Sequence, residues 1–228
     1  MKNEILFPQS TIKFLTALSK NNNKVWFEKN RVRYDFELLQ PAIQFVIDLG
    51  EKLSELSPNI IAIPKVDKSI FRLYRDVRFS KNKAPFKTNL GLYFWEGRGK
   101  KMECSGFYFH IEPKLFFLGA GMYMFTKDQL KKYREIVSDP VKGKELSDIV
   151  NKILKNKKYQ LGGKTYKKTP RGFDPDYKYR ELLLHSGLYV SYESTNFNEL
   201  TKNDPVNFSF KIFKEMYPLH KWFVENFV

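Results

Sequence analysis

The chain has few of the residues that form disulfides or bind transition metals. Its 228 residues include one cysteine, Cys104, and three histidines. A single thiol cannot form an internal disulfide, and so few thiols and imidazoles exclude a multi-cysteine zinc site and an iron–sulfur cluster. Stability must therefore come from a hydrophobic core, which a chain of this length is long enough to bury.

The sequence also lacks long apolar runs. No apolar stretch reaches the roughly 18 residues that a membrane-spanning helix requires, and no long apolar segment follows Lys2 near the N-terminus. These features predict neither a spanning helix nor a secretory signal. We therefore expect a cytoplasmic protein that does not act at a membrane.

Acidic residues are few relative to basic ones. Aspartates and glutamates number 25 against 40 lysines and arginines, which gives a formal net charge of +15. This excess suggests a polyanionic partner such as nucleic acid or a phosphorylated metabolite. Most of the basic residues are lysines, however, whose AT-rich codons make genome composition an alternative explanation. The positions of the arginines are therefore more informative than the total charge.

The spacing of apolar residues changes twice along the chain. Helical spacing over residues 8–56, with Ser10 as the expected N-cap, gives way to alternation and then returns after about residue 125. The alternating region divides into four predicted strands, at 69–79, 88–96, 104–112 and 114–124. Their short connections favour an antiparallel meander.

The remainder of the chain completes this pattern. After the meander we expect, in order, helices within 126–154, a basic hairpin-like segment turning at Gly162-Gly163, a strand at 187–193 and a final helix from about Asp204. There is no internal repeat and no long linker. The sequence predicts a single α+β domain over residues 1–228, with a central antiparallel β-meander flanked by N-terminal and C-terminal helices.

The densest polar cluster spans the first predicted strand and the loop after it. If 71–79 is a strand, alternation places Arg72, Asp76 and Arg78 on one face. Guanidinium groups bind carboxylate or phosphate through two parallel hydrogen bonds, so the pattern predicts an anion site. The residues expected to form it are Arg72, Arg75, Asp76, Arg78, Lys83, Lys87 and, from a later loop, Arg171. The alternative is an Arg–Asp network that orients the loop and binds no ligand.

The next two strands supply a polar row and open space. Tyr108, His110 and Glu112 share one face of the third predicted strand. If these side chains point to the same side of the sheet as Arg72, Asp76 and Arg78, His110 is the candidate general acid or base. The alternative is a structural histidine that only forms hydrogen bonds within the sheet. Gly119 and Gly121 share one face of the fourth predicted strand and leave room above the sheet, as the floor of a pocket requires.

Two other functions are compatible with the sequence. Asp76 with Glu112-Pro113-Lys114 matches the Asp…Glu-x-Lys string of metal-dependent nucleases, so a hydrolase or nuclease using Asp76, His110 and Glu112 is one alternative. A nucleic-acid-binding module is the other, because basic and aromatic residues interleave over Lys155–Arg180. No glycine-rich phosphate loop and no dinucleotide fingerprint is present, so we predict no cofactor and no dedicated metal.

Several short motifs resemble one known family. They are Phe14-Leu15, Leu18, Asn21-Asn22, Trp26-Phe27, Tyr34, Arg72, Arg75-Asp76-x-Arg78-Phe79-Ser80, Lys83-x-Pro85-Phe86-Lys87, Gly119-x-Gly121 and Pro170-Arg171-Gly172-Phe173. Together they resemble the bacterial and fungal family called domain of unknown function 2461, over roughly residues 7–225. The resemblance implies an intracellular single-domain protein and carries no established activity. The family often has Asp-His-Pro where this chain has Asp176-Tyr177-Lys178, so no catalytic histidine is carried over.

The leading hypothesis combines these observations. We expect a protein that binds a phosphorylated or carboxylated small molecule through the arginine-rich segment. Asp76 would orient the guanidinium groups, and His110 and Arg171 would lie nearby.

Overall fold

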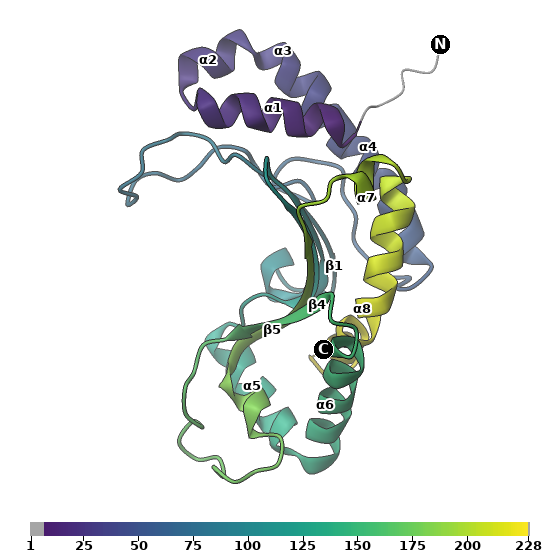
Figure 1. Cartoon of the computed structure of the whole chain (residues 1–228). Helices are drawn as coiled ribbons and strands as arrows, with labels where there is room; N and C mark the ends of the chain where they lie inside the picture. The colour runs from purple at the N-terminus through teal and green to yellow at the C-terminus, as the bar shows by residue number, and fades with distance from the viewer. Residues whose placement is uncertain (1–6, 228) are drawn as a thin grey trace.

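A computed structural model describes residues 7–227 and contains a five-stranded antiparallel sheet with helices packed on one face (Figure 1). The strands are β1 (Leu90–Glu96), β2 (Ser105–Ile111), β3 (Phe116–Met122), β4 (Tyr159–Lys164) and β5 (His185–Ser194). Their order in the sheet is β1-β2-β3-β5-β4, and each neighbouring pair is antiparallel. The predicted α+β class and the central meander are therefore confirmed.

Helices precede and follow the meander, as predicted. They are α1 (Gln9–Lys20), α2 (Lys24–Lys29), α3 (Arg31–Tyr34), the π-helical turn η1 (Asp35–Leu39), α4 (Gln40–Ser54), the 3₁₀ turn η2 (Lys101–Glu103), α5 (Lys127–Ser138), α6 (Pro140–Leu154), the 3₁₀ turn η3 (Arg180–Leu184), α7 (Asn198–Thr201) and α8 (Pro205–Phe227). In the described part of the chain, no helix is long and apolar enough to cross a membrane.

Local sequence explains where several helices begin. Thr126 and Gln129 form a reciprocal capping box at the start of α5. At the start of α6, the Asp139 side chain accepts hydrogen bonds from two backbone amides. The predicted cap at Ser10 is wrong. Helix α1 begins at Gln9, two residues earlier than that cap implies, and the Ser10 hydroxyl donates instead to the carbonyl of Glu37.

Alternation along the strands separates a buried face from an open one. Phe107, Phe109 and Ile111 of β2 are fully buried on the face that the helices cover. On this face α8 crosses β2, β3 and β5, while α4 packs on β1 and α6 on β4. Tyr108 and His110 point to the other face, which is the concave side in Figure 1. The sheet thus buries one face in the main core and leaves the other without a helical layer.

The strand predicted at 69–79 is wrong. The segment makes only isolated bridges, from Ile70 to Val66 and Leu92 and from Tyr74 to Phe86. The chain then folds back on itself through backbone hydrogen bonds from Arg75 to Pro85 and from Lys87 to Leu73. Alternation alone could not reveal this, because an irregular extended loop also places successive side chains on opposite sides. The arginine row therefore does not lie on a sheet face.

The turn predicted at Gly162-Gly163 is also wrong. Both glycines lie inside β4, at a register shift where Gly163 has φ 93°. A side chain on Gly163 would collide with the carbonyl of Gly187, and one on Gly162 with the ring of Tyr189. These glycines allow β5 to approach closely and do not reverse the chain.

One buried polar cluster connects the sheet to α8. His220 is fully buried, with Nδ1 3.0 Å from Ser105 Oγ and Nε2 3.4 Å from Glu96 Oε2. The Ser57 hydroxyl donates to the same carboxylate. The hydrogen bond from His220, with a smaller effect from Ser57, lowers the pKa of Glu96 to about 2 against the opposing effect of burial.

This cluster predicts a specific acid sensitivity. Because the pKa of Glu96 is lower in the folded chain than its usual 4.5, its contribution to stability is complete above that value and is lost as pH falls toward 2. Glu96→Gln should reduce the free energy of unfolding by roughly 2–3 kcal/mol at neutral pH and flatten this acid-dependent loss. Urea denaturation across this pH range measures both effects, with the exposed Glu193→Gln as control. An unchanged pH profile in Glu96→Gln would contradict the assignment.

Candidate functional site

The arginine-rich segment forms an exposed loop, which we call the arginine loop (residues 71–87). Arg72, Asp76 and Arg78 are all exposed, and Arg78 pairs with Asp76 at 2.7 Å between Nη2 and Oδ2. This hydrogen-bonded pair lowers the pKa of Asp76 and raises the pKa of Arg78. Asp76 therefore orients one of the three arginines, Arg78, by a direct ion pair.

Two further residues of the predicted anion site, Arg75 and Lys83, form hydrogen bonds within the loop itself. Arg75 donates from Nη1 to the carbonyl of Ala84 at 3.2 Å and from Nη2 to Ser80 Oγ at 3.4 Å. Lys83 donates from Nζ to the carbonyl of Val77 at 3.0 Å. These contacts match the alternative in which the network orients the loop. Ligand binding by the exposed side chains stays a prediction.

Arg171 does not join this cluster. It is exposed in the connection between β4 and η3, which lies at the opposite end of the open face from the arginine loop (Figure 1). The expectation that Arg171 closes over the arginine cluster is therefore wrong.

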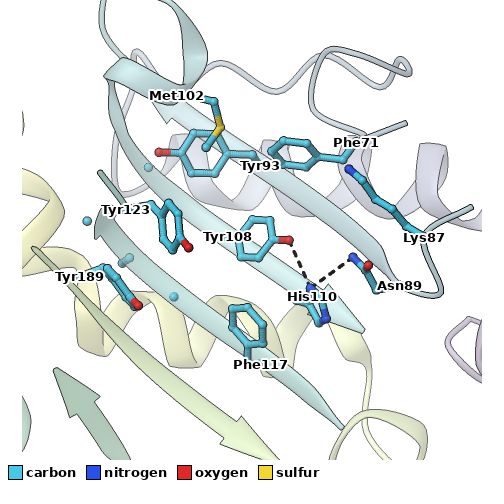
Figure 2. A pocket seen from close by; sticks show the side chains of 14 residues that line it. Phe71, Lys87, Asn89, Tyr93, Met102, Tyr108, His110, Phe117, Tyr123 and Tyr189 are labelled. Carbon is cyan, nitrogen blue, oxygen red and sulfur yellow. Dashed lines mark hydrogen bonds between the residues drawn. The ribbon is translucent and has the colours of Figure 1, made fainter. Parts of the chain in front are cut away.

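The open face of the sheet instead contains a hollow of about 360 Å³ (Figure 2). Six aromatic rings surround it, those of Phe71, Tyr93, Tyr108, Phe117, Tyr123 and Tyr189. Polar side chains gather toward one end of the hollow, and they are Lys87, Asn89 and His110. Among the predicted anion-binding residues, Lys87 lines the hollow and the others do not.

Glycines create the space above the strands. Gly119 and Gly121 line the hollow, which confirms the predicted floor. Beside them, Tyr108 lies across Gly91, where an added Cβ would stand 2.6 Å from the tyrosine hydroxyl. Tyr189 covers Gly162 in the same manner. The rings can lie low over the sheet because the backbone below them carries no side chains.

His110 is the centre of a hydrogen-bonded row along β2. Its Nε2 lies 3.3 Å from Glu112 Oε2, and its Nδ1 lies 3.2 Å from Tyr108 Oη and 3.5 Å from Asn89 Nδ2. An ionised carboxylate only accepts, so Nε2 carries the hydrogen and Nδ1 accepts from Tyr108 or Asn89. The predicted common face of Tyr108, His110 and Glu112 is confirmed, whereas the predicted arginine row on that face is wrong.

The protonation states of this row follow from burial. Burial lowers the pKa of His110, although the hydrogen bond to Glu112 opposes the shift, and burial raises the pKa of Tyr108 to about 12. At neutral pH the imidazole is therefore neutral and the phenol keeps its proton. Together the two groups can exchange a proton with a bound ligand, which is the chemistry of a general acid and base.

Lys87 brings a positive charge to the rim of the aromatic hollow. It is half-buried, and its Nζ lies 5.6 Å from the centroid of the Phe71 ring. Lys101 approaches the same ring at 4.3 Å. Burial lowers the pKa of both lysines. Among residues 7–227, no carboxylate lies within ion-pair distance of Lys87, although the charge of Asp67 acts on it at longer range and opposes the lowering of its pKa.

The carboxylates of the nuclease alternative serve different partners. Asp76 binds Arg78 in the arginine loop, whereas Glu112 binds His110 beside the hollow. Over residues 7–227, no three His, Cys, Asp or Glu side chains gather as a metal site would require. The geometry therefore does not support the Asp76–Glu112 metal pair.

Several residues of the hollow were not identified from the sequence. They are Phe71, Asn89, Tyr93, Met102, Phe117, Tyr123 and Tyr189. The sequence feature that could have identified them is the combination of aromatic residues and glycines on the same face of neighbouring strands. Using it for Tyr189 required knowing that β5 pairs with β3, which places this tyrosine opposite Gly121.

A family model described as "Conserved hypothetical protein (DUF2461)" matches residues 10–222. The chain belongs to this family. The resemblance inferred from the short motifs is therefore confirmed. The DUF2461 match covers the arginine loop, all five strands and every residue that lines the hollow. No curated protein and no solved structure matches the chain.

The arginine loop predicts unequal roles for two of its arginines. Arg75→Ala removes the bonds to Ala84 and Ser80 and should lower the free energy of unfolding by about 1 kcal/mol. Arg78→Ala removes an ion pair at the surface and should leave stability unchanged. Urea denaturation of the two variants distinguishes the roles. Equal effects would show that the bonds of Arg75 do not brace the loop.

The row along β2 predicts a depressed titration of His110. Its midpoint should lie below the ordinary 6.5, and Glu112→Gln should lower it further because the interactions that raise the pKa are weakened. Two-bond ¹H–¹⁵N NMR measures the titration, and His110→Gln identifies the signal among the three histidines. A midpoint above 6.5, or one insensitive to Glu112→Gln, would contradict the row.

Proposed function

We propose that the hollow binds a small molecule that has a flat apolar body and a carboxylate or phosphate group. The observation that carries this proposal is the half-buried Lys87 at the rim of an aromatic hollow, with no carboxylate of the described residues within ion-pair distance of it. A charge held in this position recognises an anion more strongly than an exposed lysine does, because water competes less for it.

The rings determine the expected shape of the ligand. A volume of about 360 Å³ lies within the usual range for small-molecule sites. Tyr108, Phe117 and His110 pack against one another, with the His110 and Phe117 rings stacked 4.5 Å apart. Such a surface favours a planar ligand, which can stack on the rings with little loss of contact.

Hydrogen-bonding groups add orientation. The Tyr108 hydroxyl and the Asn89 amide both lie within reach of His110 Nδ1, and both face the hollow (Figure 2). A ligand oxygen that displaces His110 as their partner would be held close to the imidazole. The anionic group of this ligand is the one predicted from the sequence, with Lys87 as the retained anion-binding residue, whereas its flat apolar body is inferred from the rings of the hollow.

Proton transfer to or from the bound ligand is a second candidate function. The linked Tyr108, His110 and Glu112 support it, since a carboxylate that orients a histidine is a recurrent arrangement in acid–base catalysis. This version of the enzyme hypothesis keeps His110 and Glu112 and omits Asp76.

Matched probe molecules test the proposal. 2-Naphthoate should bind more tightly than the neutral 2-naphthamide, by about tenfold, because only the acid forms a charged contact with Lys87. Lys87→Met should remove this preference while retaining binding of the amide. Quenching of intrinsic fluorescence measures both affinities, and Lys214→Met, on the helix that packs on the other face of the sheet, is the matched control.

A filled hollow provides the complementary variant. Gly119→Val should abolish binding of both probes, since its side chain would occupy the floor. The fold should tolerate it, because an added Cβ meets only the Val190 carbonyl, at 3.4 Å. Circular dichroism confirms folding. Equal affinity for acid and amide in the unmodified protein, or unchanged binding in folded Gly119→Val, would refute the proposed site.

A further inference from the structure

The tip of the arginine loop presents an aromatic ring to solvent. Phe79 is 95% exposed, the highest value among the large hydrophobic side chains described. The guanidinium carbon of Arg78 lies 5.8 Å from its ring centroid. Neither residue lines the hollow, so this feature is independent of the proposed small-molecule site.

The loop is braced by its own polar groups. Arg75 binds the Ala84 carbonyl and Ser80, Lys83 binds the Val77 carbonyl, and the amide of Ala84 donates to Asn82. These bonds surround the tip without covering Phe79. A loop fixed in this way holds the ring in place before any partner arrives, which lowers the entropy lost on binding.

Positive charge surrounds the exposed ring. Residues 71–87 contain six lysines and arginines and a single acidic residue, Asp76. Asp76 is already paired with Arg78, whereas Arg72 and Lys81 are exposed. A flat ring flanked by cations suits a chain in which flat bases alternate with phosphates, because bases stack on aromatic side chains and phosphates bind basic ones.

A second basic loop lies on the same side of the sheet. The connection between β4 and η3 contains the exposed Lys167, Lys168, Arg171 and Lys178. Figure 1 shows both loops projecting on the open side of the sheet, at opposite ends of it. Between them the open face carries Tyr123, which is 64% exposed. An extended polyanion with flat groups could contact all three surfaces.

We propose that the arginine loop binds single-stranded nucleic acid, with a base stacked on Phe79 and phosphates against Arg72 and Lys81. The strand then runs across the open face toward the second basic loop. An anionic bilayer fits less well, because inserting Phe79 would also force the charged Asp76–Arg78 pair beside it toward the apolar phase.

Fluorescence anisotropy with a fluorescein-labelled 12-nucleotide oligouridylate tests the proposal. Affinity should fall steeply as salt rises, because phosphate contacts release counterions. Phe79→Ala should weaken binding by about fivefold or more through loss of stacking. Lys81→Ala should reduce the slope of log affinity against log salt by roughly 0.7. Both residues are exposed, so the variants should fold normally.

Matched controls separate the loop from general charge and hydrophobicity. Phe36→Ala removes another phenylalanine, 72% exposed in η1, and Lys214→Ala removes a charge on α8; neither should alter affinity by more than about twofold. The proposal would be overturned if the oligonucleotide did not bind at low salt, or if Phe79→Ala bound it with the same affinity as the unmodified protein. Phe79-dependent binding to phosphatidylserine vesicles without binding to the oligonucleotide would overturn it as well. Phe79→Ala should leave the affinity for 2-naphthoate unchanged, because Phe79 does not line the hollow, and this keeps the two tests separate.

Discussion

The pairing of β2 with β3 places Phe109 opposite Leu118 and Tyr108 opposite Gly119. The first pair faces the helices and is fully buried, while the second faces the hollow. A shift of one residue would turn His110 into the core and Phe109 into the open face, since side chains alternate along a strand. The contact of α8 with Phe107 and its neighbours opposes such a shift. The core thereby fixes the composition of the site, although the two lie on opposite faces of the sheet.

Two histidines on opposite faces of the sheet show how the face determines what a side chain can do. His220 lies on the covered side, where Ser105, Ser57 and Glu96 surround it and solvent does not reach it. His110 lies on the open side, where Glu112 orients a ring whose other nitrogen meets groups that face the hollow. Both imidazoles adjoin a carboxylate and a hydroxyl. Only the second is placed where a ligand can approach, so accessibility rather than the constellation itself separates a structural cluster from a candidate reactive one.

Much of the fold could be predicted from the spacing of apolar residues along the sequence. Alternation from Leu90 to Met122 identified β1, β2 and β3, the common face of Tyr108 and His110, and the glycine floor, because one buried face imposes a strict pattern. The arginine loop was misassigned since its apolar residues alternate equally well in a chain that folds back on itself. The position of Asp76 indicated an Arg–Asp pair, but the spacing of the arginines gave no sign that a backbone carbonyl would engage Arg75. The ring of Tyr189 was missed because its position depends on a strand pairing that no local pattern reveals.

The packing of two tyrosines on glycines has a consequence for how the shape of the hollow could change. Tyr108 over Gly91 and Tyr189 over Gly162 leave no space for even a methyl group beneath either ring. A substitution at those glycines would lift the ring and narrow the cavity without replacing any residue that lines it. If the hollow binds a ligand as proposed, selectivity among ligands of different thickness would be adjustable from beneath the rings, while the side chains that line the hollow stay the same.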